Sequence, residues 1–229
     1  MKKTLNTSHK GNIWCGLACG AILAFSPNLH AQTDALQGYS GGMQIIWAAS
    51  TGYTLGWQFQ ANQDISVTAL GVYELNPWST DHEVGLWDDS NQQLLADVTV
   101  ASSDPESQDS NGNEIRWVTL STPLDLSAGL TYAIAAYYPA SGGTIHDNFQ
   151  ELCSSVTTDP DITYVQSVRT LNDEPFTFPD TANESENGTA FFGPNFQFTS
   201  APEPSTSALF GIGFIALFGL QRYHAKRKA

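Results

Sequence analysis

Turn-forming residues divide residues 32–200 into short segments, at intervals of about ten residues. Clusters of Gly, Pro, Asn, Asp and Ser separate runs rich in Val, Ile, Thr and aromatic residues, and no run has the periodicity of an amphipathic helix. This pattern predicts an all-β fold, an antiparallel two-sheet sandwich with jelly-roll-like connections. The expected strands span residues 42–48, 53–60, 65–74, 82–87, 93–100, 115–120, 131–138, 162–168 and 190–198.

Some local features of this fold can be placed from the sequence. In the strand expected at 65–74, apolar residues alternate with more polar ones, so one face is marked as the core face. Segment 85–95 has Asp, Ser and Asn between two apolar runs and predicts a hairpin. Asn111-Gly112 predicts a second turn, which closes a polar loop at residues 102–114.

The first 31 residues have the three parts of a secretory signal peptide. Three lysines precede an uncharged, largely apolar run at residues 13–25, and Ala31 supplies the small residue expected at a cleavage point. We expect this signal helix to be removed after Ala31; a retained anchor is the alternative, although the run is shorter than the about 20 residues that cross a bilayer. Cleavage leaves Cys153 as the one cysteine, which excludes an internal disulfide.

The other end of the chain, residues 201–229, has a different character. Residues 205–220 carry no charge, and as a helix they would rise about 24 Å, a little less than the about 30 Å of a bilayer core. Four basic residues follow within the tail at 221–229, and clustered basic residues remain cytoplasmic. The sequence therefore predicts a transmembrane helix at 205–220, with the ectodomain, residues 32–200, on the periplasmic side of the inner membrane.

The motif Pro202-Glu203-Pro204, followed by an apolar helix and a basic terminus, resembles the PEP-CTERM sorting signal of Gram-negative bacteria with exopolysaccharide systems. The resemblance implies that an exosortase, a membrane cysteine transpeptidase, recognises these three residues and cuts near them. The ectodomain would then pass to the cell surface or extracellular matrix. Ala201 stands where such signals often have Val. A permanent single-pass anchor is the alternative.

A second resemblance covers residues 50–198. It is carried by Tyr53-Thr-Leu-Gly-Trp-Gln-Phe59, by Gly85-Leu-Trp87, by residues 117–123 and by Phe192-Gly-Pro-Asn-Phe196. These segments are similar to a family of uncharacterised β-sandwich domains in bacterial secreted proteins. No activity is established for that family, so the likeness implies fold and location only.

The ectodomain is strongly acidic. From Gln32 to Pro204, Arg116 and Arg169 are the two basic residues against all 23 acidic residues, a formal charge of −21. Such a surface argues against nucleic acid or an anionic membrane surface as a partner. It suits a hydrated extracellular matrix, with divalent cations as screening or bridging ions.

No catalytic residues are expected. The mature ectodomain has two histidines, His82 and His146, which we interpret as surface or loop residues, and it has no hydrolase or phosphate-binding motif. Carboxylates are abundant, so a glycosidase pair is not excluded by their number, but its separation cannot be obtained from sequence. A secreted glycan-active enzyme therefore stays a distant alternative.

Calcium is the ligand that the polar loop could hold, although no cofactor is expected. Asp104, Glu106, Asp109 and Asn111 supply the hard oxygen donors that Ca²⁺ prefers, and Asn113 and Glu114 follow them. The glycine is not spaced as in an EF-hand loop. A flexible, solvated acidic loop is the favoured interpretation.

Five tryptophans of the ectodomain could stack on sugar rings if they were exposed. Trp47, Trp57, Trp87 and Trp117 fall in expected strands, where core positions are favoured. Trp78 falls in a loop and is the candidate platform for carbohydrate. The sequence therefore favours a non-catalytic surface or matrix protein associated with exopolysaccharide, with a carbohydrate-binding module as the second hypothesis.

Overall fold

The structure is a computed structural model. It describes residues 31–41, 43–47, 52–74, 80–139, 147–151, 155–170, 175–182 and 192–200. Within these ranges the regular elements are β-strands, and no helix is long and apolar enough to cross a membrane. The predicted signal peptide up to residue 30, the sorting motif and the transmembrane helix at 205–220 lie outside the described residues.

The strands are numbered in chain order. They are β1 Thr33–Asp34, β2 Leu36–Ser40, β3 Met43–Trp47, β4 Tyr53–Ala61, β5 Ile65–Tyr73, β6 His82–Asp88, β7 Gln93–Val100, β8 Glu106–Gln108, β9 Glu114–Leu126, β10 Thr131–Tyr138, β11 Asp147–Glu151, β12 Ser155–Thr158, β13 Ile162–Arg169, β14 Thr181–Ala182 and β15 Pro194–Ser200.

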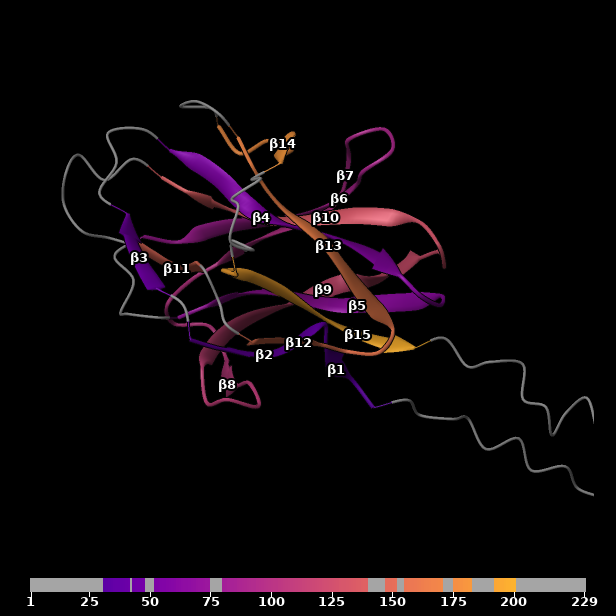
Figure 1. The fold of residues 1–229 in the computed structure, drawn as a ribbon, viewed down its shortest axis with the longest axis horizontal. Helices are drawn as coiled ribbons and strands as arrows, with labels where there is room; N and C mark the ends of the chain where they lie inside the picture. Colours follow the sequence, from indigo (N-terminus) through magenta and orange to yellow (C-terminus); the bar gives the residue numbers. More distant parts are fainter. Residues whose placement is uncertain are drawn as a thin grey trace, which may run out of the picture.

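Two antiparallel sheets make up the body of the domain and lie one over the other (Figure 1). The five-stranded sheet has the order β1-β15-β5-β9-β8, and the six-stranded sheet has the order β14-β13-β4-β10-β6-β7. Strands β2 and β12 form one two-stranded ribbon, and β3 and β11 form another. The predicted all-β antiparallel sandwich is confirmed, with connections that pass repeatedly from one sheet to the other.

Aromatic side chains fill the space between the sheets. Trp57 and Phe59 of β4 point inward from one sheet, and Phe196 and Phe198 of β15 point inward from the other. The rings of Phe59 and Phe196 lie 4.7 Å apart between centroids. Burying one such side chain contributes about 1.5–3 kcal/mol to the free energy of unfolding. Strand β15, the last of the ectodomain, buries two of them and therefore contributes strongly to the core.

The alternation predicted in β5 is confirmed: Ile65, Val67 and Ala69 are buried, whereas Ser66 and Thr68 are partly exposed. The predicted hairpin is the antiparallel pair β6–β7. The predicted turn at residues 111–112 places Gly112 at a positive φ of 84°, and the turn before β10 places Gly129 at a positive φ of 78°. Other residues rarely adopt this conformation, which explains glycine there.

One strand extends well beyond its prediction. The sequence predicts a strand that ends at Leu120, but β9 runs to Leu126. Its register against β5 shifts between the pairs Thr119–Ala69 and Leu124–Val67. The residues between, which include Pro123, bulge out of the ladder, so a proline is tolerated there without losing a hydrogen bond.

Candidate functional site

The polar loop that carries the predicted calcium ligands is largely ordered by backbone pairing. Strand β8 runs through its middle and pairs with β9, with Glu106 opposite Arg116. The prediction of a loop is therefore wrong for Glu106–Gln108, which form a strand, whereas the expected exposure of these residues to solvent is confirmed. All three residues of β8 are polar and exposed, so the apolar alternation by which strands are found is missing here.

Asp109 lies at the turn that follows β8, and it is buried, with 8% of its surface exposed. Its Oδ1 accepts hydrogen bonds from the backbone N–H groups of Asn111 and Asn113, at 2.8 and 2.9 Å. Its Oδ2 accepts from the Asn113 side-chain amide at 2.7 Å and from the Tyr73 hydroxyl at 3.1 Å. These four donors fill the roughly four acceptor sites of a carboxylate. Asp109, a predicted calcium ligand, therefore stabilises the turn instead.

Tyr73 is the partner of Asp109 that the sequence did not suggest. It ends β5, its ring packs edge-on against Tyr39 with centroids 4.9 Å apart, and its side chain is fully buried. Burial, and next the Asp109 carboxylate, raise the pKa of the Tyr73 phenol. The hydroxyl therefore stays protonated and serves as a donor at any physiological pH.

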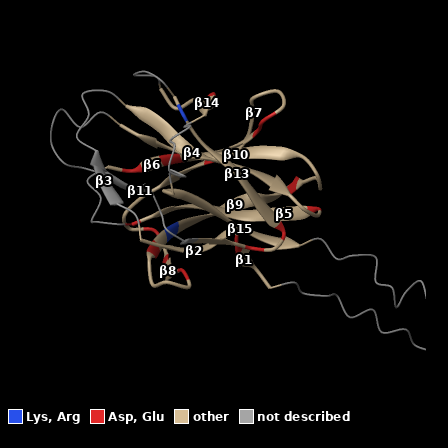
Figure 2. Ribbon diagram, viewed as in Figure 1, with Lys and Arg blue, Asp and Glu red and all other residues tan. Residues whose placement is uncertain are grey.

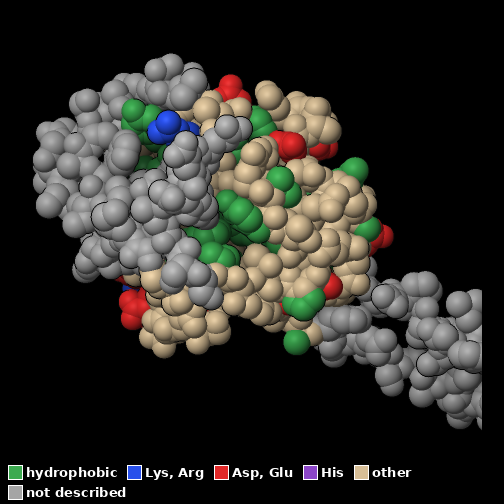
Figure 3. Space-filling view, viewed as in Figure 1, with side chains coloured by type: hydrophobic (Ala, Val, Ile, Leu, Met, Phe, Trp, Pro, Cys, Tyr) green, Lys and Arg blue, Asp and Glu red, His purple; other side chains and the backbone are tan. Residues whose placement is uncertain are grey.

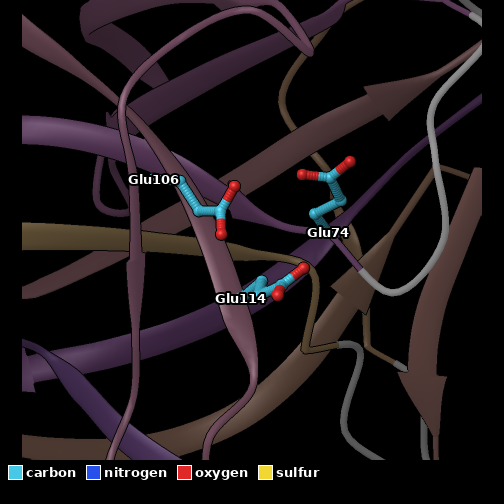
Figure 4. Close-up of side chains that lie close together, drawn as sticks. All are labelled: Glu74, Glu106 and Glu114. Atoms are coloured by element: carbon cyan, nitrogen blue, oxygen red, sulfur yellow. The ribbon is translucent and has the colours of Figure 1, made fainter.

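A second cluster forms where β8 and β9 meet the end of β5. One carboxylate oxygen each from Glu74, Glu106 and Glu114 lie within 4.8 Å of one another, which is close enough to share a metal ion (Figure 4). Among the described residues, Asp104 and Asp109 do not belong to this group. Of the oxygen donors predicted in the loop, the described structure therefore brings Glu106 and Glu114 together, and it adds Glu74 from the end of β5.

Arg116 supplies the positive charge beside this cluster. Its Nε donates to Glu74, its Nη2 lies 2.7 Å from the Glu106 carboxylate, and its Nη1 donates to the backbone carbonyl of Asp104 at 3.0 Å. The bond to Glu74 raises the pKa of the guanidinium. Arg116 thus pairs with two of the three clustered carboxylates, and the formal charge of the four groups together, one positive and three negative, is −2.

The histidine and the tryptophans described by the structure have structural roles. His82 was expected at the surface or in a loop, but it begins β6 and is buried, with its Nδ1 3.0 Å from the carbonyl oxygen of Tyr137. Trp57, Trp87 and Trp117 are buried in strands, as predicted. Trp47 belongs to β3. Trp78, His146 and Cys153 lie outside the described residues.

Acidic residues are spread over the described part of the domain and far outnumber basic ones (Figure 2). Figure 2 shows acidic residues on loops and strand ends around the domain, whereas basic residues occur at the positions of Arg116 and Arg169. Figure 3 shows hydrophobic side chains gathered near the centre of one face. The large hydrophobic residues that are exposed in the described part of the chain are Leu94, Leu130, Val156 and Val165.

These features define the class of protein as a β-sandwich domain that is rich in acidic residues and poor in basic ones. The chain belongs to the family described as a domain of unknown function, DUF4082, which matches residues 44–192. The PEP-CTERM protein-sorting motif matches residues 200–222. No curated protein matches the sequence. The chain is thus an exported protein that is handled at the membrane by exosortase, and both predicted resemblances are confirmed.

Proposed function

We propose that this protein is a non-catalytic component of the cell surface or extracellular matrix, where it associates with exopolysaccharide. The observation that carries the proposal is the position of the sorting motif. Its match begins at Ser200, which is the last residue of β15. The whole sandwich therefore lies upstream of the tail, as cargo that the sorting step can deliver intact.

The proposed route has two membrane stages. A signal peptide ending at Ala31 exports the chain, and the helix at 205–220 holds the ectodomain on the periplasmic side of the inner membrane. Exosortase then cuts near Pro202-Glu203-Pro204 and releases the sandwich to the surface or matrix. The −21 formal charge between Gln32 and Pro204 supports this destination, because a highly charged domain stays soluble in a hydrated matrix.

The absence of a catalytic role is supported by how the described ionisable groups are used. The Asp109 carboxylate closes a turn, and Arg116 is bound by Glu74 and Glu106. His82 is buried with Nδ1 bonded to a carbonyl. Groups that are committed to the fold in this way are poorly placed to exchange protons with a substrate.

The route can be tested in the native host with the full chain. Deletion of the exosortase gene, or replacement of Pro202-Glu203-Pro204 by three alanines, should leave the protein in the membrane fraction with its basic tail attached. An unchanged distribution between membrane and surface fractions in both strains would contradict sorting by exosortase.

Association with exopolysaccharide is tested separately. Trp78 is the proposed platform, because an indole ring can stack on a sugar ring. We expect a polysaccharide pull-down to retain the wild-type protein and to lose Trp78→Ala, whereas Leu94→Ala, which removes an exposed apolar side chain elsewhere, keeps wild-type retention. Equal retention of both variants would reject Trp78 as the platform, and no retention of the wild type would reject the association.

A further inference from the structure

The first and last strands of the ectodomain pair with each other. In β1, Thr33 lies opposite Phe198 and Asp34 opposite Gln197 of β15. Neighbouring strands are about 5 Å apart, so the start of β1 and the end of β15 lie side by side in the sandwich (Figure 1). Thr33, two residues after the predicted cleavage point, and Ser200, two residues before Pro202 in the sequence, therefore lie at the same end of the sandwich, called here the terminal end.

Strand β15 is held in the sheet up to its last residue. It lies between β1 and β5, and its pairing with β5 continues through Thr199–Ser66 to Ser200–Ile65. The Ser200 hydroxyl also donates to the Asp161 carboxylate at 2.6 Å. Only Ala201 separates this fixed residue from Pro202, and one extended residue spans about 3.3–3.6 Å.

One turn fastens both strands of the terminal end. The Asp159 carboxylate accepts hydrogen bonds from Thr33 of β1 at 3.1 Å and from Gln37 of β2 at 3.0 Å. Two residues later, the Asp161 carboxylate accepts from Ser200 and from Gln63. Residues 159–161, between β12 and β13, therefore tie the start of the ectodomain and its last strand to the same short segment.

The loops next to Ser200 are also fixed. Ile65, which pairs with Ser200, pairs on its other side with Leu126 of β9. The following backbone N–H of Ala128 donates to the Asp64 carboxylate at 2.8 Å, and that of Gly129 donates to the carbonyl oxygen of Ala61 at 2.7 Å. The terminal end is therefore a built surface of paired strands and hydrogen-bonded loops.

This construction limits where a peptide-cutting enzyme can bind. Ala201 is the one residue in the sequence between Ser200, where β15 ends, and the motif Pro202-Glu203-Pro204. Binding more upstream residues in an enzyme cleft would require β15 to leave its place between β1 and β5 and would expose the fully buried Phe196 and Phe198. Any enzyme that reaches the motif in the folded protein must therefore come within a few ångströms of the terminal end.

We propose that exosortase receives the ectodomain already folded, contacts its terminal end around Ser200, and cuts no bond before Ala201. The inference rests on the proposed sorting by exosortase and adds the surface that the enzyme meets. In the reaction, the enzyme's cysteine sulfur forms a thioester with the upstream carbonyl carbon, the peptide C–N bond breaks, and the downstream amine leaves with a proton. An amine or water then takes the acyl group and restores the thiol.

The chemistry of the terminal end also indicates the enzyme surface that would fit it. Asp64, Asp159 and Asp161 bring negative charge there, and both described arginines lie in other parts of the sheets, Arg116 in β9 beside β8 and Arg169 at the end of β13 beside β14. A neutral or basic rim around the enzyme's cleft is compatible with this surface, whereas an acidic rim would be repelled.

The test uses the full chain in its native host, with intact-mass measurement of the processed protein over time. One variant carries Gly-Ser-Gly-Ser between Ser200 and Ala201, which keeps the motif but moves it away from the terminal end. A control carries the same insertion between Ser102 and Ser103, two exposed residues in the turn after β7. We expect the first insertion to slow processing about tenfold and the control to be processed at the wild-type rate.

The outcomes separate this inference from the sorting proposal. A wild-type product that ends between Ala201 and Pro204, together with slower processing of the Ser200–Ala201 insertion alone, supports the inference. A product that ends before Ala201, or equal rates for the two insertions, overturns it while sorting stands. If the wild type is not processed and Arg222 to Ala229 stay attached, the sorting proposal itself fails.

Discussion

Two turns of the sandwich contain aspartate carboxylates that accept hydrogen bonds, but their partners differ. The Asp109 turn, between β8 and β9, buries its carboxylate and bonds mainly to its own backbone and to Tyr73. The Asp159–Asp161 turn, between β12 and β13, bonds to residues far away in the chain, among them Thr33 and Ser200. One carboxylate shapes a loop, and the other pair joins the two ends of the domain.

In a domain with so few basic residues, these turn carboxylates are stabilised by hydrogen bonds rather than by ion pairs. Ion pairs are available at Arg116 and Arg169 alone among residues 32–204, so the described turns satisfy their carboxylates with backbone N–H, hydroxyl and side-chain amide donors. Such bonds to a charged acceptor are worth about 1.5–3 kcal/mol each at most. Acidic composition by itself therefore does not indicate metal binding here.

The largest expected effect is at the Asp109 turn. Asp109→Ala removes the acceptor of four hydrogen bonds and leaves buried donors without a partner, so we expect the free energy of unfolding to fall by about 3 kcal/mol. Urea unfolding measures the change. Asp97→Ala, at an exposed position of β7, is the matched control and should change stability by less than about 0.5 kcal/mol. Equal effects of the two variants would show that the buried turn has no special weight.

Arg116 gives the next largest effect. Arg116→Gln leaves Glu74 and Glu106 without their cation, and Glu74 is mostly buried, with 11% of its side chain exposed. We expect a loss of about 1–2 kcal/mol that becomes smaller in high salt, because salt screens the repulsion among the remaining carboxylates. A loss that does not depend on salt would mean that packing of the arginine stem, rather than charge, is responsible.

The Asp159–Asp161 turn should show a smaller but more local effect. Ser200→Ala removes one hydrogen bond to Asp161, which should lower the free energy of unfolding by about 1 kcal/mol. Hydrogen exchange should become faster at the end of β15 and stay unchanged in β7. Unchanged exchange at Thr199 and Ser200 would contradict the role of Asp161 in fastening the last strand.

The effect of Asp34, in β1 at the terminal end, on stability should depend on pH. Burial raises the pKa of its carboxyl above 3.8, so the folded protein binds this proton more tightly than the unfolded chain. Its contribution to stability therefore falls as pH rises through the folded pKa, and at neutral pH the ionised carboxylate lowers the free energy of unfolding. Asp34→Asn should gain about 0.5 kcal/mol at pH 7 and nothing near pH 3. The same gain at both pH values, or a gain for exposed Asp125→Asn, would reject this explanation.

Calcium should have the smallest effect. Asp109 already has four hydrogen-bond donors, and Arg116 already pairs with Glu74 and Glu106. Adding Ca²⁺ in the millimolar range, or removing it with a chelator, should therefore move the thermal midpoint by less than about 1 °C. A clear rise that Glu106→Gln abolishes would instead establish a calcium site at the glutamate cluster.

The sequence predicts the regular part of this fold well because strands such as β7 and β10 combine apolar runs with clear turn residues. It fails where pairing, rather than side-chain character, decides the structure. Strand β8 is polar throughout, and β9 continues past Pro123 because a bulge accommodates the proline.

The site residues show the same limit. The sequence shows that Asp109 is acidic and Asn113 is nearby, but it gives no sign that Tyr73 meets them from another strand. Asp159-Pro160-Asp161 is recognisable as a turn signal. Its contacts with Thr33 and Ser200 depend on the long-range pairing of β1 with β15, which local patterns do not carry. The sorting tail, in contrast, is a contiguous sequence motif, so it can be predicted without knowledge of the fold.

The most direct test of the account is the intact mass of the protein recovered from the native cell surface. We predict a single processed species that begins at Gln32 and ends between Ala201 and Pro204, with every strand from β1 to β15 retained. A surface species that still carries Arg222 to Ala229, or one that has lost part of β15, would contradict it.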